Sequence, residues 1–160
     1  MGTWSEFFGA ELGAAAALTG LVIVGISINI ARILSHPILP GRAAETLVTP
    51  TGVLVASSYA LVPQQPDWLF GSEIAATGLA MWIIPAVIQL NAIRSKDGPS
   101  LRLLLPRVLL AQVSSLPLVA AGILIFAGVH GALYWVVPGV IASLIATVLN
   151  AWVLLVEILR

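Results

Sequence analysis

The sequence predicts an all-α protein: a polytopic membrane helix bundle of five transmembrane helices, built from a tandem parallel two-helix repeat plus a fifth helix. Composition is the first reason. Hydrophobic residues occupy 59% of the 160 positions and charged residues only 9%, whereas a soluble domain is about 25% charged. With so few polar groups to face water, we expect one transmembrane domain over 1–160 whose main partner is the lipid bilayer.

The second reason is five long apolar segments separated by turn sequences. Each is about 20 residues or longer, the length that crosses the hydrocarbon core of a bilayer. The connections are rich in Pro and Gly, as in "SHPILPGR" at 35–42 and "SKDGPS" at 95–100, which is typical of turns. The predicted spans cover about 7–34, 43–62, 70–95, 103–127 and 132–159.

The third reason is a motif that recurs after 62 residues. "FGAE" at 8–11 returns as "FGSE" at 70–73, and the same offset carries Asn29 onto Asn91 and Arg32 onto Arg94. Repeat 1 would cover about 7–62 and repeat 2 about 70–127, with 132–159 outside the pattern. Both copies would cross in the same direction, so we expect a pseudo-twofold axis along the membrane normal.

The basic residues predict the orientation. They lie in the first and third connections and their flanks and at the C-terminus, and none lies at the N-terminus or in the other two connections. The positive-inside rule then places the N-terminus outside and the C-terminus in the cytoplasm. The seven are Arg32, Arg42, Arg94, Lys96, Arg102, Arg107 and Arg160.

The repeated glutamates have two interpretations. Glu11 and Asn29 are 18 residues apart, which is five helical turns and ~27 Å, so both project from one face, near its two ends. The acids can be interfacial caps wetted by headgroups, with the arginines as topology anchors. Alternatively, both acids face a shared polar crevice that binds a cation or proton. The candidate ion or substrate path then comprises Glu11, Glu73, Asn29, Asn91, Arg32 and Arg94.

Two polar stripes run along the second and fourth predicted helices. One carries Glu45 and Thr49, and the other carries Arg107 and Ser114, in each case at helical spacing. Glu45 and Arg107 would lie at similar depth on the cytoplasmic side. We therefore expect an ion pair between the repeats, with a structural role.

The fifth predicted helix carries small residues at every fourth position, which allow another helix to approach closely. A polar stripe with a seven-residue period follows a neighbouring edge. The two alternatives are packing within the bundle and an oligomer interface or pore lining. The residues are Gly139, Ser143, Thr147 and Ala151, with Asn150 and Glu157 on the polar edge.

Several function classes lack support in the sequence. There is no cysteine, so thiolate chemistry and sulfur metal sites are excluded, and no basic tract indicates nucleic acid. No catalytic motif, metal site or cofactor site is predicted, and we do not expect an enzyme. The predicted function is an oligomeric channel or carrier for a small ion or solute, with a homo-oligomer expected. The alternative is a non-catalytic membrane partner or regulatory subunit that acts through helix contacts.

The stretches "FFGAELGAAAALTGLVIVGISIN", "LPGRAAETL" and "NAWVLLVEILR" resemble a group of small multi-pass membrane proteins from actinobacteria and related bacteria. Most members have no assigned function, and some are labelled modulator of FtsH protease. The resemblance covers roughly 7–47 and the C-terminal stretch. It implies a multi-pass protein of the bacterial inner (plasma) membrane and carries no catalytic residue over to this chain.

Overall fold

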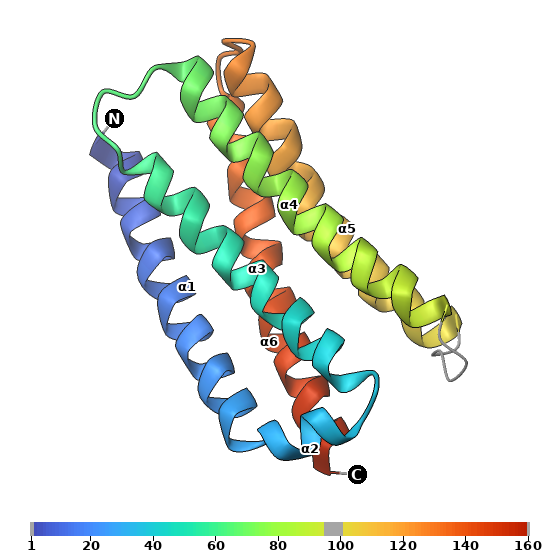
Figure 1. The fold of residues 1–160 in the computed structure, drawn as a ribbon. Helices are drawn as coiled ribbons and strands as arrows, with labels where there is room; N and C mark the ends of the chain where they lie inside the picture. The colour runs from blue at the N-terminus through green and yellow to red at the C-terminus, as the bar shows by residue number, and fades with distance from the viewer. Residues whose placement is uncertain (1, 95–100, 160) are drawn as a thin grey trace.

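The computed structural model describes residues 2–94 and 101–159, and the side chains of residues 4–94 and 104–156. Every element in these ranges is a helix (Figure 1). The elements are α1 (Gly2–Ile28), α2 (Ile30–Ser35), α3 (Leu39–Ala60), α4 (Asp67–Arg94), α5 (Leu101–Phe126), the 3-10 turn η1 (Ala132–Trp135) and α6 (Val136–Leu159).

Four of these helices are long and apolar enough to cross a membrane. The qualifying segments are Trp4–Ile28, Asp67–Arg94, Leu104–Phe126 and Ala132–Val156. Helix α3, with 22 residues, is long enough but carries Arg42, Glu45 and several threonines and serines. The fold is thus an all-helical membrane type with four candidate spans, and the predicted count of five and the repeat are not confirmed.

Helix α3 lies at the centre of the bundle, which explains its polarity. It packs against α1, α4 and α6 (Figure 1). Its buried residues include Glu45, Thr46 and Ser57. Neighbouring helices therefore shield polar side chains that would be costly to expose to lipid.

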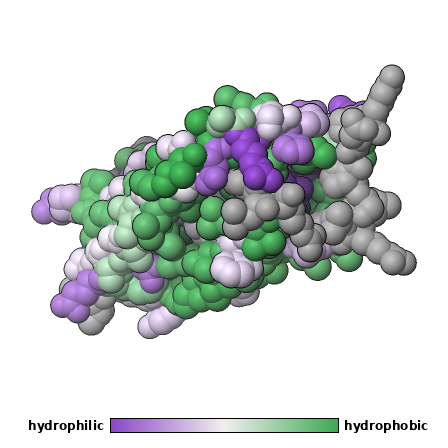
Figure 2. Space-filling model, turned by 90° about the horizontal axis from the view of Figure 1, so that it is seen from below, coloured by the Kyte–Doolittle hydropathy of each residue, from purple (hydrophilic) through white to green (hydrophobic). Residues whose placement is uncertain are grey.

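Consecutive long helices run in opposite directions, so the chain termini lie at opposite ends of the bundle (Figure 1). The connections after α3 and after α5 lie at the N-terminal end. Helix α2 and the last turns of α4 and α6 lie at the C-terminal end. Figure 2 shows the bundle from this second end, with a hydrophilic patch next to apolar side chains.

An apolar core fills the half of the bundle nearer the N-terminal end. It joins α1, α3, α4, α5 and α6, and its side chains are buried because long apolar helices meet there. The core includes Phe8, Val53, Ile74, Leu118, Ile125 and Val136.

The first predicted span, 7–34, is interrupted at Asn29. The Asn29 side-chain Nδ2 donates a hydrogen bond to the Gly25 carbonyl at 2.9 Å, and its backbone leaves helical geometry with φ −105° and ψ 12°. An asparagine side chain that bonds to nearby backbone competes with the helical ladder. As a result α1 ends at Ile28, and Arg32 belongs to the short helix α2.

Helices α4 and α5 make the closest contact in the bundle, and glycines permit it. A Cβ added at Gly78 would lie 2.8 Å from the Val119 nitrogen, and one at Gly122 would lie 2.6 Å from the Ala75 Cα. Both separations are far below van der Waals contact. Small residues at these positions let the two backbones touch.

Candidate functional site

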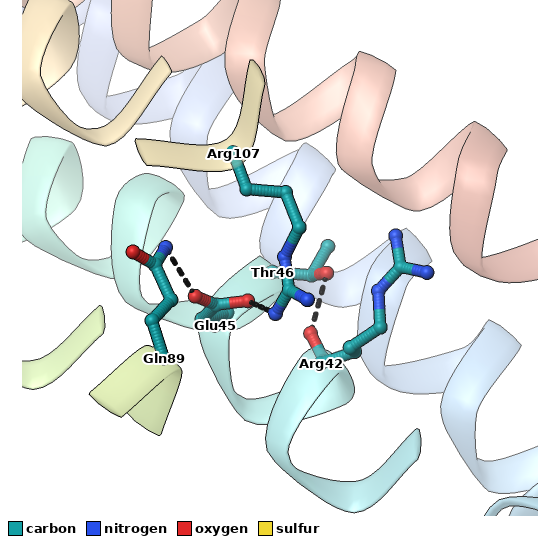
Figure 3. A network of polar contacts seen from close by, with 5 residues as sticks. All are labelled: Arg42, Glu45, Thr46, Gln89 and Arg107. Carbon is teal, nitrogen blue, oxygen red and sulfur yellow. Dashed lines mark hydrogen bonds and ion pairs between the residues drawn. The ribbon is translucent and has the colours of Figure 1, made fainter. Parts of the chain in front are cut away.

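A buried polar network links three helices around Glu45. The Gln89 side chain on α4 donates from Nε2 to Glu45 Oε1 at 2.6 Å, and Arg107 on α5 donates from Nη2 to Glu45 Oε2 in an ion pair (Figure 3). The side chains of Arg107 and Glu45 are only 12% and 9% exposed. The Glu45 carboxylate on α3 thus accepts a hydrogen bond from a side chain of α4 and from a side chain of α5.

The helix boundaries explain why these three residues meet. Glu45 is six residues after the start of α3, Gln89 is five before the end of α4, and Arg107 is six after the start of α5. At about 1.5 Å per residue, all three lie ~8–9 Å from the C-terminal end of the bundle. Helices packed side by side in alternating directions bring those positions to one level.

Both oxygens of the Glu45 carboxylate are hydrogen-bonded, and the half-buried guanidinium of Arg42 also interacts electrostatically with Glu45 and Arg107. Each oxygen of Glu45 receives one of the two donors described above. A buried ion pair is tolerated in an apolar surrounding when its hydrogen bonds are made in this way. Arg42 lies one turn away on α3, where its backbone carbonyl accepts a hydrogen bond from Thr46 (Figure 3).

The network forms one wall of a small pocket, which we call the polar pocket. It has a volume of about 20 Å³, close to the minimum that a water molecule needs. Helices α3, α4, α5 and α6 all contribute to it. Its lining residues are Glu45, Thr49, Met81, Pro85, Gln89, Arg107, Leu110, Ala111, Ser114, Ala146 and Asn150.

Two features of the polar pocket leave hydrogen-bonding groups without an obvious partner. Ser114 is 2% exposed, and its hydroxyl has no hydrogen-bond partner among the described residues. Pro85, inside α4, lacks the N–H that the carbonyl of Met81 would otherwise accept from. Met81 and Pro85 both line the polar pocket.

The predicted path residues are not gathered at one place. Glu11 lies on α1 and Glu73 on α4, and helix α3 packs against both of these helices (Figure 1). Glu11 is half-buried, with an Oε2 that lacks a partner among the described residues. Glu73 accepts a hydrogen bond from Gln65. Asn29 bonds to its own helix, and the remaining three side chains are exposed: Asn91, Arg32 and Arg94.

The small-residue positions of the fifth predicted helix lie mainly inside the chain. Gly139, Ser143 and Thr147 are buried. The two hydroxyls bond to carbonyls one turn earlier in α6, and a Cβ at Gly139 would lie 2.9 Å from the Leu118 side chain on α5. Gly139 and Ser143 therefore pack against α5, whereas Thr147 lines a groove between α1 and α6.

The other members of that set have different surroundings. Asn150 lines the polar pocket. Ala151 lines an apolar groove of about 280 Å³ between α1 and α6, together with Leu21, Val22 and Trp152. The side chain of Glu157 lies outside the described residues.

Gln89 is the site residue that our sequence reasoning missed. Thr49 and Ser114 belong to the polar stripes of the second and fourth predicted helices, whereas no other polar residue lies one turn before or after Gln89 in the sequence. A signal was available, because an amide inside a long apolar segment usually faces the bundle interior. Its position four residues after Pro85 adds to that signal.

Among the described residues, no three His, Asp or Glu side chains cluster closely enough to hold a metal ion. Comparison with known proteins adds no assignment. No protein-family model, no curated protein and no solved structure matches the chain.

Proposed function

We propose that the chain is a small carrier or channel of the bacterial inner membrane, and that a small polar solute or ion passes through the polar pocket. In this proposal α3 is a fifth span, the N-terminus is outside, the C-terminus is cytoplasmic, and the protein assembles as a homo-oligomer. The two hairpins α1–α3 and α4–α5 would correspond to the repeats. No catalytic step is part of the proposal.

The observation that carries the proposal is the polar pocket itself. Four helices each supply a polar side chain to it: Thr49, Gln89, Arg107 and Asn150. Polar and ionisable residues inside membrane bundles are costly and commonly mark a substrate or ion pathway. Only 9% of the chain is charged, yet two charged residues, Glu45 and Arg107, lie together at one buried point.

The apolar core favours a carrier over an open channel. It lies between the polar pocket and the N-terminal end, and Leu118, Val53 and Ile74 in it are fully buried. A channel needs a continuous polar path, whereas a carrier opens to one side at a time. The pocket, about 8 Å from the C-terminal end, would then be accessible from the cytoplasm, and Glu11 and Glu73 would flank the outer entrance.

Flux in reconstituted liposomes tests this proposal. The probes are water, glycerol and urea by light scattering, and Na⁺, K⁺, Cl⁻ and H⁺ by ion-sensitive dyes. We expect at least one probe to move faster than in protein-free liposomes. Asn150→Leu, which places an apolar side chain in the pocket, should reduce that flux about tenfold.

Ser27→Leu is the matched control, because it also replaces a polar side chain by leucine, at an exposed position of α1. Its flux should equal that of the unchanged protein. The double variant Glu11→Gln with Glu73→Gln examines the outer entrance and should lower flux without abolishing it. Movement of no probe at all would contradict a transport function.

A second candidate function rests on the groove between α1 and α6. Helix α1 is poorly covered, with Leu21 69% and Ile28 77% exposed, and the groove could receive a helix of another membrane protein. The resemblance to proteins labelled modulator of FtsH protease agrees with such a role. In this case the chain would regulate a partner instead of moving a solute.

Site-specific crosslinking separates the two candidates. Because the chain has no cysteine, Leu21→Cys introduces a single reactive thiol in the groove, and Leu109→Cys gives an exposed control on α5. A partner role predicts a crosslink to one other membrane protein from Leu21→Cys alone. A crosslink only to a second copy of the chain would contradict the partner role and support the homo-oligomer.

A further inference from the structure

Ser114 differs from the other buried hydroxyl residues around it. Ser115, Ser143 and Thr147 each donate a hydrogen bond to the carbonyl four residues earlier in the same helix, at 2.6, 2.7 and 2.8 Å. The hydroxyl of Ser114 has no partner among the described residues, although only 2% of the residue is exposed. A buried hydroxyl without a hydrogen bond costs free energy, so its position on the polar pocket requires an explanation.

The two charged residues that line the polar pocket, Glu45 and Arg107, are paired with each other. The one carboxylate of the pocket, Glu45, receives Gln89 on one oxygen and Arg107 on the other. The lining residues contribute no further charged group, and Arg42 is not among them. A bound cation would have to displace Arg107 from Glu45, and a bound anion would have to displace Glu45 from Arg107.

The other polar groups of the pocket suit a neutral molecule. Thr49, Ser114 and Asn150 line it, and each side chain can both donate and accept a hydrogen bond. A volume of about 20 Å³ admits one molecule of the size of water.

We propose that the polar pocket binds one neutral, water-sized hydrogen-bonding molecule through the hydroxyl of Ser114, and that the transported solute belongs to this class. The assignment of the transported solute rests on the transport function proposed above, whereas the binding of a molecule at Ser114 does not. Water satisfies the site at rest, because it supplies the donor and acceptor that Ser114 lacks. The Glu45–Arg107 pair closes the wall of the site and is not the ligand-binding group.

Thermal unfolding of two serine variants tests the binding site without any transport measurement. Ser114→Ala removes the proposed anchor, and Ser57→Ala removes a second buried hydroxyl that also lacks a partner among the described residues but does not line the pocket. Losing a ligand-bound hydroxyl is destabilising, whereas losing an orphan hydroxyl is neutral or stabilising. We expect Ser114→Ala to lower Tm by about 3 °C or more and Ser57→Ala to leave it unchanged or raise it.

Equal or higher Tm for both variants would overturn the binding site. The solute class is tested in the liposome assay with water, urea and glycerol as neutral probes and K⁺ and Cl⁻ as charged ones. Faster movement of water, reduced about fivefold or more by Ser114→Ala, supports the proposal. Faster movement of urea or glycerol would overturn the water-sized class and leave the transport function standing. Movement of ions alone would overturn the assignment of a neutral solute and leave the transport function standing. If no probe moved, the transport function would be contradicted. The Tm comparison would then still decide whether Ser114 binds a molecule in the polar pocket.

Discussion

Replacing Glu45 by leucine is expected to lower the free energy of unfolding by about 3–5 kcal/mol, because it leaves the guanidinium of Arg107 buried without its counter-ion. Arg107→Leu should cost a similar amount, since the carboxylate would then lose its cation. The Gln89 amide also loses its acceptor when Glu45 is replaced. Reversible unfolding in detergent micelles or bicelles measures both variants.

The double variant Glu45→Leu with Arg107→Leu is the informative companion. Removing both charges leaves no unpaired ion, so it should regain much of the stability lost in each single variant. Arg94→Leu, at an exposed position on α4, is the control and should change stability by less than about 0.5 kcal/mol. Additive losses in the double variant would show that the two residues do not act as a pair.

Gly122→Val is expected to separate α4 from α5 and to cost about 3 kcal/mol or more. The added side chain has no room, because a Cβ at this position already meets the backbone of Ala75, with the Cα at 2.6 Å. Backbone atoms cannot rotate away as a side chain can. Gly78→Val meets Val119 on the same interface and should behave similarly, with folded yield and Tm in detergent as the measurements.

Gly9→Val and Gly13→Val are the matched controls on α1. A Cβ at either glycine has no heavy atom within 4 Å outside its own helix, and replacing a helical glycine slightly favours the helix. Both variants should fold with normal yield and unchanged or slightly raised Tm. If Gly122→Val also folded normally, the close contact between α4 and α5 would not be a source of stability.

The helical class and the boundaries of the long helices could be predicted well, because hydrophobic length depends on local sequence alone. The expected segment 70–95 appears as Asp67–Arg94, and 103–127 appears as Leu101–Phe126. The break at Asn29 was missed. It depends on one side chain bonding to Gly25, an alternative that an apolar pattern does not reveal.

The sequence by itself determined that this chain is built of apolar helices of membrane-spanning length, and that Glu45 and Arg107 lie at one depth. Those properties follow from composition and from residue counts along each helix. Only the tertiary structure decided which faces meet: it joins Gln89 to Glu45 and places Ser114 and Asn150 on one pocket. The physical reason is that depth is set by distance along a helix, whereas side-chain partners are set by how each helix is rotated and by which helices pack together.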